Sequence, residues 1–242
     1  MAELDDQTRK LTLKVVYYGP ALSGKTTNLQ ALHDASSPDS AGRLMTLETR
    51  DDRTLFFDLL PLAFRGARGF NVRIKVFTVP GQVIHASTRR LVLQGTDGIA
   101  FIADSQHAET DHNADSFRDL RENLKQNGLS LKQMPLAIQF NKRDLTDIRS
   151  DDEIREQALQ GSEPVYLAVA TQCQGVVETF VGLLHLTWQG LDVRHGLTKK
   201  LGFDTKAFFQ EVLSKFNRDQ ELRQVLAARV GARSAFARTG AQ

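Results

Sequence analysis

The 242-residue sequence predicts an α/β fold in which helices cover both faces of a mostly parallel sheet. Short apolar runs typical of buried strands alternate with segments of helical periodicity. A glycine-rich loop stands between the first of these runs and the helix that follows it. Two further polar motifs come directly after apolar runs, at the end of the strands where open parallel sheets bind ligands.

The strands are expected at seven apolar runs, and the helices at four segments between or after them. The expected strands are residues 13–18, 44–49, 54–60, 72–79, 98–103, 135–140 and 165–169. The expected helices are residues 27–33 and 113–126, a segment after residue 151, and residues 175–188. Pro61 is expected to close the run that precedes it.

The glycine-rich loop, GPALSGKT from Gly19 to Thr26, has the pattern of a phosphate-binding loop. Gly19 and Gly24 permit backbone conformations that let consecutive N–H groups converge on phosphate oxygens. The helix that follows adds the positive end of its dipole. Lys25 supplies a positive charge to the β- and γ-phosphates, and the Thr26 hydroxyl is a candidate Mg²⁺ ligand. The residues expected to contact the phosphates are Gly19, Leu22, Ser23, Gly24, Lys25, Thr26 and Thr27.

The second motif consists of Asn141, Lys142 and Asp144 at the end of the run 135–140. A carboxylate there can accept two hydrogen bonds from guanine, whereas adenine offers no such pair of donors. The motif therefore favours GTP over ATP. The backbone N–H of Ala170, after the last expected strand, is a candidate donor to the guanine carbonyl.

The third motif follows the run 72–79 and contains Gly81 and Gln82. The N–H of Gly81 can reach a γ-phosphate, and Gln82 can orient an attacking water. Thr54 is the second candidate Mg²⁺ ligand. Arg53, beside it, could neutralise charge that develops in the transition state, the alternative being a surface salt bridge with a neighbouring aspartate.

The chain is expected to be cytoplasmic, without a transmembrane or lipid anchor. Its polar N-terminus lacks the apolar core of a secretory signal, and no run approaches the ~18 apolar residues of a membrane span. Sequence signals for myristoylation and prenylation are absent. The single cysteine, Cys173, excludes an internal disulfide framework. A net charge of +2 gives no reason to expect a nucleic-acid partner.

On these residues the chain resembles the MglA family of bacterial Ras-like small GTPases, over about residues 13–191. The segments that carry the resemblance are VVYYGPALSGKTTNLQ, DDRTLFFDLLP, FTVPGQV, DGIAFIADSQ and QFNKRDL. The resemblance implies a Ras-like fold with a six-stranded sheet, one edge strand of which is antiparallel. It also implies a GTP/GDP switch cycle in bacterial cell polarity and surface motility, with which recruitment to a cell pole would be compatible.

The resemblance further implies slow intrinsic hydrolysis and an activating partner. That partner is a roadblock-type homodimer, MglB, which does not insert an arginine of its own. Arg53 then corresponds to an arginine finger supplied in cis, and Gln82 to the residue that positions the water. The effectors in polarity and motility are not identified by the resemblance.

Two positions depart from the usual Ras-like pattern. Thr78 stands where most Ras-like proteins have an aspartate that holds a Mg²⁺-bound water, although the MglA group shares this threonine. Because a hydroxyl adds no charge, weaker Mg²⁺ binding is expected. Val169, Ala170 and Thr171 replace the usual Ser-Ala-Lys loop, which removes the lysine and leaves the backbone contact available.

We divide the chain into a polar N-terminal segment (1–11), a small GTPase domain (12–193) and a basic helical extension (194–242), of which about the last 10 residues are expected to be disordered. The extension holds ten basic and four acidic residues. Its Phe208, Val212 and Phe216 lie at helical spacing. Three alternatives are open: a helix packed back on the domain, a partner-docking or autoregulatory element, and a basic surface for anionic lipid.

Two alternatives to a hydrolysing switch are also open. The first is a guanine-nucleotide-binding scaffold with negligible hydrolysis, which Thr78 leaves possible. The second is a P-loop ATPase or kinase. The motif Asn141–Asp144 disfavours it, and the chain has no separate domain for a phosphate acceptor.

Overall fold

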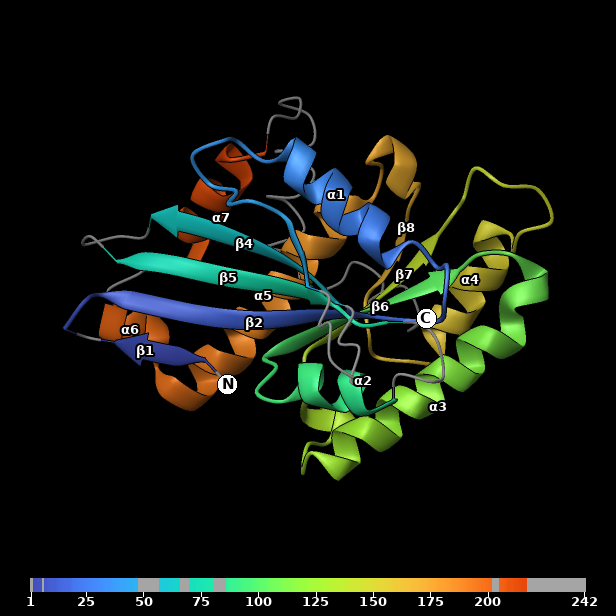
Figure 1. Cartoon of the computed structure of the whole chain (residues 1–242), viewed down its shortest axis with the longest axis horizontal. Helices are drawn as coiled ribbons and strands as arrows, with labels where there is room; N and C mark the ends of the chain where they lie inside the picture. The colour runs from blue at the N-terminus through green and yellow to red at the C-terminus, as the bar shows by residue number, and fades with distance from the viewer. Residues whose placement is uncertain are drawn as a thin grey trace, which may run out of the picture.

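The computed structural model describes residues 2–5, 7–47, 57–65, 70–80, 86–201 and 205–216. Within these residues eight strands form one sheet of order β3-β4-β5-β2-β6-β7-β8, with β1 paired to β2 (Figure 1). The strands are β1 (Glu3–Asp5), β2 (Lys10–Tyr18), β3 (Met45–Leu47), β4 (Phe57–Arg65), β5 (Asn71–Thr78), β6 (Gly98–Asp104), β7 (Leu136–Asn141) and β8 (Val165–Leu167). The helices are α1 (Lys25–Ala35), α2 (Ala86–Leu93), α3 (Thr110–Gln126), α4 (Asp151–Leu159), α5 (Val176–His195), α6 (Leu197–Leu201) and α7 (Thr205–Ser214).

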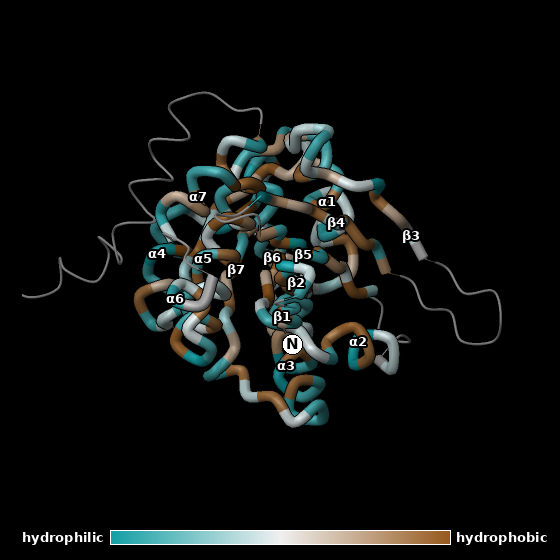
Figure 2. The backbone as a smooth tube through the Cα atoms, turned by 90° about the vertical axis from the view of Figure 1, so that its left-hand side faces the viewer, coloured by the Kyte–Doolittle hydropathy of each residue, from teal (hydrophilic) through white to brown (hydrophobic). Residues whose placement is uncertain are grey.

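The predicted α/β class is confirmed. Strand β2 pairs in parallel with β5 and β6, and β6, β7 and β8 continue the parallel part of the sheet. Strands β1, β3 and β4 are antiparallel to their neighbours. The sheet exceeds the six strands implied by the resemblance through the two short strands β1 and β3. Figure 2 shows β3 at the margin of the molecule, away from β2 and β6 in the middle.

Two hydrophobic clusters lie on opposite faces of the sheet. Leu13, Val15 and Tyr17 of β2 pack with residues of α1, α5 and α7. Val16 and Tyr18 pack with residues of α2, α3 and α4. Successive side chains of a strand point to opposite faces, so a strand covered on both faces reads as an unbroken apolar run. This explains why β2 was recognisable from sequence.

Strand β4 does not end at Pro61, as the sequence suggested, but continues to Arg65. The carbonyl of Pro61 accepts a hydrogen bond from the N–H of Gly42 at 2.8 Å, on the side away from β5. The nitrogen and carbonyl of one strand residue point to the same side, so the missing N–H of Pro61 also faces outward. The ladder between β4 and β5 therefore remains intact.

Two elements had no counterpart among the expected ones. Strand β1 and the first residues of β2 lie within the segment 1–11, and β1 pairs with residues 10–12. Helix α2 has a short, polar first half, ASTR, and therefore a weak periodic signal. Val92 and Leu93 at its C-terminal end are buried in the second cluster.

The first part of the C-terminal extension packs back onto the domain. Phe208 of α7 stacks on Trp188 of α5 at 4.6 Å between ring centroids, and Phe209 meets His185 edge-on at 5.2 Å. Phe216, just after α7, is buried as well. Residues 217–242 lie outside the described part of the chain. No described helix combines the length and apolarity needed to cross a membrane.

Candidate functional site

The phosphate loop joins the end of β2 to the start of α1, as predicted. Gly24 occupies the N-cap of α1 in the left-handed conformation (φ 92°), and no side chain caps the helix. The first-turn N–H groups are therefore not claimed by a capping side chain, which suits an anion. A Cβ on Gly19 would lie 2.2 Å from the carbonyl oxygen of Ile102, so this position excludes any side chain.

Lys25 lies inside the loop and is 7% exposed. Its ammonium donates to the carbonyl oxygens of Gly19 (3.0 Å) and Pro20 (2.5 Å). Burial, together with the positive charge of Arg89 and against the opposing effect of Asp58, lowers the pKa of Lys25 to about 8. The amine is therefore mostly charged at pH 7 and loses its proton above about pH 8, where a bound anion would favour the charged form again.

Nucleotide affinity is expected to fall above about pH 8. Phosphate oxygens next to Lys25 stabilise its charged form, so above the pKa of the free protein each binding event must take up a proton. The affinity for GDP should then fall by up to ~10-fold per pH unit. Calorimetry in buffers of different ionisation heat should show proton uptake at pH 9 and little at pH 7.

Two results bear on this expectation. Binding without proton uptake at pH 9 would contradict it. Any GDP binding retained by Lys25→Arg should lack this proton uptake, because a guanidinium stays charged throughout the range.

The carboxylate of Asp58, which was not among the predicted site residues, is hydrogen-bonded to Thr26 at the end of the phosphate loop. Asp58 of β4 is 6% exposed. Its Oδ2 accepts hydrogen bonds from the hydroxyls of Thr26 (2.7 Å) and Thr78 (2.9 Å), and its Oδ1 accepts one from Thr46 (2.9 Å). The N–H of Asp58 donates to Thr78 Oγ1 at 2.9 Å. Four segments far apart in the sequence thus meet at one buried charge.

This donor set fits a magnesium site. Thr26 gives its proton to Asp58, which leaves the lone pairs of Thr26 Oγ1 available to a hard cation. Asp58 brings the negative charge that Thr78 lacks, from the strand next to it. The prediction of weaker Mg²⁺ binding took only the charge at position 78 into account, and it stays a prediction.

The guanine motif is tied to the phosphate loop through Asn141. Its Nδ2 donates to the carbonyl of Ser23 (2.9 Å) and its Oδ1 accepts from the N–H of Ala170 (3.0 Å). A Cβ on Gly24 would lie 2.3 Å from Asn141 Nδ2, which explains the glycine there. Lys142 adopts a left-handed backbone conformation (φ 65°) and pairs with the buried Asp104 at 2.6 Å.

The remaining expected base contacts are placed less directly. The side chain of Asp144 is exposed. The N–H of Ala170 is already donated to Asn141, so a guanine carbonyl would have to replace that acceptor to receive it. Gln139 of β7 was not among the predicted site residues. It is fully buried, and its side-chain amide donates to Asn28 of α1 (3.0 Å) and to Thr179 of α5 (2.8 Å), which links the strand to both helices.

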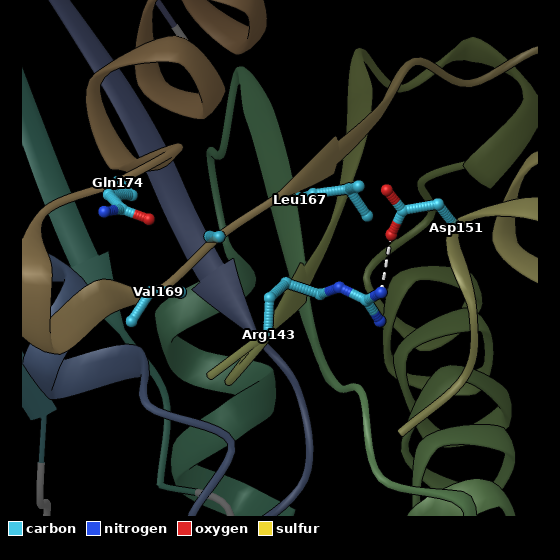
Figure 3. Close-up of a pocket in the computed structure, with 6 residues that line it drawn as sticks. Arg143, Asp151, Leu167, Val169 and Gln174 are labelled. Atoms are coloured by element: carbon cyan, nitrogen blue, oxygen red, sulfur yellow. Dashed lines mark hydrogen bonds and ion pairs between the residues drawn. The ribbon is translucent and has the colours of Figure 1, made fainter. Parts of the chain in front are cut away.

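Arg143 turns away from the guanine motif. Its guanidinium donates to Asp151 at 2.6 Å, and both residues line a pocket of about 310 Å³ (Figure 3). Leu167, Val169 and Gln174 also line this pocket. Arg143 is therefore bonded to the start of α4, and no described contact joins its side chain to the phosphate loop.

Four predicted site residues lie outside the described residues: Arg53, Thr54, Gly81 and Gln82. The strands next to these residues in the sequence, β4 and β5, are described. Thr78 ends β5 three residues before Gly81, and Phe57 begins β4 three residues after Thr54. Thr78 and Asp58 are hydrogen-bonded to each other and Asp58 also accepts from Thr26, so the described ends of β5 and β4 meet beside Thr26.

Comparison with known proteins agrees with this geometry. No family model matches the sequence. The Mutual gliding-motility protein MglA of Myxococcus xanthus (strain DK1622) is 42% identical over 186 residues, which cover 77% of this chain and 95% of that protein. The chain belongs to the MglA family. It is thus a Ras-like P-loop GTPase by fold and a nucleotide-dependent switch protein by family. Members of the MglA family bind GTP and GDP, which accounts for the joined phosphate and guanine motifs.

Proposed function

We propose that the chain binds GTP, hydrolyses it slowly to GDP, and acts as a switch in gliding motility and cell polarity. The observation that carries the proposal is the double hydrogen bond of Asn141, which joins the phosphate loop at Ser23 to the guanine loop at Ala170. A site built this way favours a ligand that has both a guanine base and phosphates. The similarity to a gliding-motility protein supports the cellular role.

The phosphate loop holds the nucleotide in this proposal. Lys25 neutralises the β- and γ-phosphates, and Gly19, Leu22, Ser23, Gly24, Thr26 and Thr27 supply backbone N–H groups or hydroxyls. Asp144 accepts from the guanine edge, while Lys142 and Ala170 flank the base. These assignments combine the sequence motifs with the positions of their backbones in the fold.

Magnesium would be held by Thr26 and Thr54, with Asp58 orienting Thr26. When bound there, the ion would supply positive charge beside the β- and γ-phosphates. By accepting the proton of the Thr26 hydroxyl, Asp58 would leave the lone pairs of that hydroxyl available to the ion. Thr78 holds Asp58 in place from the neighbouring strand.

Arg53 and Gln82 would perform the chemistry, and a homodimeric roadblock-type protein of the MglB kind would accelerate it. Gln82 orients the attacking water, with the γ-phosphate held by the N–H of Gly81. Arg53 neutralises charge that develops in the transition state, a contribution of roughly 10³- to 10⁵-fold in this reaction class. We further propose that the switch acts in the cytoplasm, with recruitment to a cell pole as part of its polarity role.

The test is single-turnover hydrolysis with Mg²⁺, with and without the roadblock homodimer, for the unaltered chain, Arg53→Ala and Gln82→Ala. We expect acceleration of the unaltered chain by about 10³-fold or more, and its loss in both variants while GTP still binds. A near-zero rate in all samples would favour a scaffold that only binds nucleotide. Thermal stabilisation by ATP equal to that by GTP would overturn the guanine assignment.

A further inference from the structure

The end of helix α7 is bonded to the connector between α1 and β3, residues 36–44. The N–H of Ser37 donates to the carbonyl of Lys215 at 2.6 Å, and Ser36 and Phe216 form an antiparallel bridge. Phe216 is 2% exposed, and its ring lies edge-on to that of Phe180 in α5 at 5.8 Å. The C-terminal extension thus pairs by its main chain with a segment some 180 residues earlier, in addition to burying apolar side chains.

The same connector is bonded to strand β4. The N–H of Gly42 donates to the carbonyl of Pro61 (2.8 Å), and the N–H of Ala63 donates to the carbonyl of Ser40 (2.8 Å). Within the connector, the N–H of Ser40 donates to the carbonyl of Ser37 (2.9 Å). A continuous series of main-chain hydrogen bonds therefore runs from Lys215 through the connector to β4.

Strand β4 carries Asp58 three residues before Pro61. Asp58 contacts Thr26 of the phosphate loop and Thr78 at the end of β5. Because a paired strand moves largely as a unit, the position of residues 61–63 affects the position of Asp58. The extension is consequently connected to the proposed magnesium site through described residues alone.

We propose that α7 and Phe216 position β4, and with it Asp58, so that the C-terminal extension strengthens the magnesium-dependent retention of guanine nucleotide. The inference rests on the proposed function, since it names a further determinant of the same site. Phe216 is a positioning residue in this scheme, because it acts through the connector and β4. An extension that only adds buried apolar area would stabilise the whole domain without favouring the magnesium-bound form.

The test compares the release of a fluorescent GDP from the full chain in Mg²⁺ and in EDTA, for the unaltered protein, Phe216→Ala and Gln210→Ala. Gln210 lies on the exposed side of α7 and serves as the matched control. We expect Phe216→Ala to lower the ratio of the EDTA rate to the Mg²⁺ rate by about 10-fold, a typical size for coupling between sites. Gln210→Ala should leave that ratio unchanged.

Two results for Phe216→Ala would overturn the inference. In one, release rises by the same factor in Mg²⁺ and in EDTA, as general destabilisation predicts. In the other, neither rate changes. Failure of the unaltered chain to bind GDP would instead overturn the proposed function, so the two failures can be told apart.

A second measurement on the unaltered chain covers the case in which Phe216→Ala does not fold. Coupling between two sites is reciprocal, so Mg²⁺ added to the GDP-bound protein should protect residues 205–216 from hydrogen exchange. Helix α3, on the other face of the sheet, is the internal reference. Protection of α7 that changes no more than that of α3 would contradict the inference.

Discussion

Asp58→Asn is expected to weaken magnesium binding by about 100-fold in the GDP-bound protein, the upper end for groups that orient a metal ligand. The amide keeps the shape of the carboxylate but removes its charge. Its NH₂ group also cannot accept a proton from Thr26 or Thr78, each of which now donates to Oδ2. Titration of magnesium-dependent GDP release measures the effect.

Two further variants separate charge from packing at Asp58. Thr46→Val removes only the bond to Oδ1, from an exposed position, and should change magnesium affinity by less than about 3-fold. Adding Thr78→Asp to Asp58→Asn returns a carboxylate to the same place from β5 and should recover part of the loss. Unchanged magnesium affinity in Asp58→Asn would show that this carboxylate does not serve the site.

Asn141→Ala is expected to weaken GDP binding by about 100-fold or more. The substitution leaves the carbonyl of Ser23 without its buried donor and unties the phosphate loop from the guanine loop, and a loss of this kind costs about 1 to 3 kcal/mol. The GDP affinity of Asn141→Asp should lie between those of the unaltered chain and Asn141→Ala. The aspartate keeps the acceptor for the Ala170 N–H and loses the donor to the Ser23 carbonyl. Equilibrium titration with a fluorescent GDP gives both values.

Arg143→Ala is the control for Asn141. Its side chain contacts Asp151 and the carbonyl of Arg149, on the far side of the same loop. We expect a change of less than about 3-fold, typical of a partly exposed pair. Equal losses in Asn141→Ala and Arg143→Ala would mean that the loop as a whole, and no particular bond of Asn141, determines binding.

Sequence alone predicted the part of the site that lies on consecutive residues. The phosphate loop needs glycines, a lysine and a threonine between a strand and a helix, and all of this is local. The strand β2 and the helix α5 also carry enough apolar residues to be recognised. The α/β class and the family followed from these segments.

Asp58 could not be found in this way because its role depends on strand pairing. Its partners lie on α1, β3 and β5, and they meet only after β4 has paired on both sides. In the sequence, Asp58 is a single acidic residue within an apolar run. Pro61 misled for a similar reason, since whether proline ends a strand depends on which side of the sheet its nitrogen faces.

The short strand β8 limits how the protein can associate at its edge of the sheet. It spans three residues, Val165–Leu167, and the residues on either side of it are described as non-strand. A strand added beside it would gain few main-chain hydrogen bonds. On the other side of the sheet, the outer side of β4 at Pro61 is already paired with the connector at Gly42. At both places regulators and further copies of the chain are therefore expected to bind through helices and loops, and fibre growth by strand addition is disfavoured there.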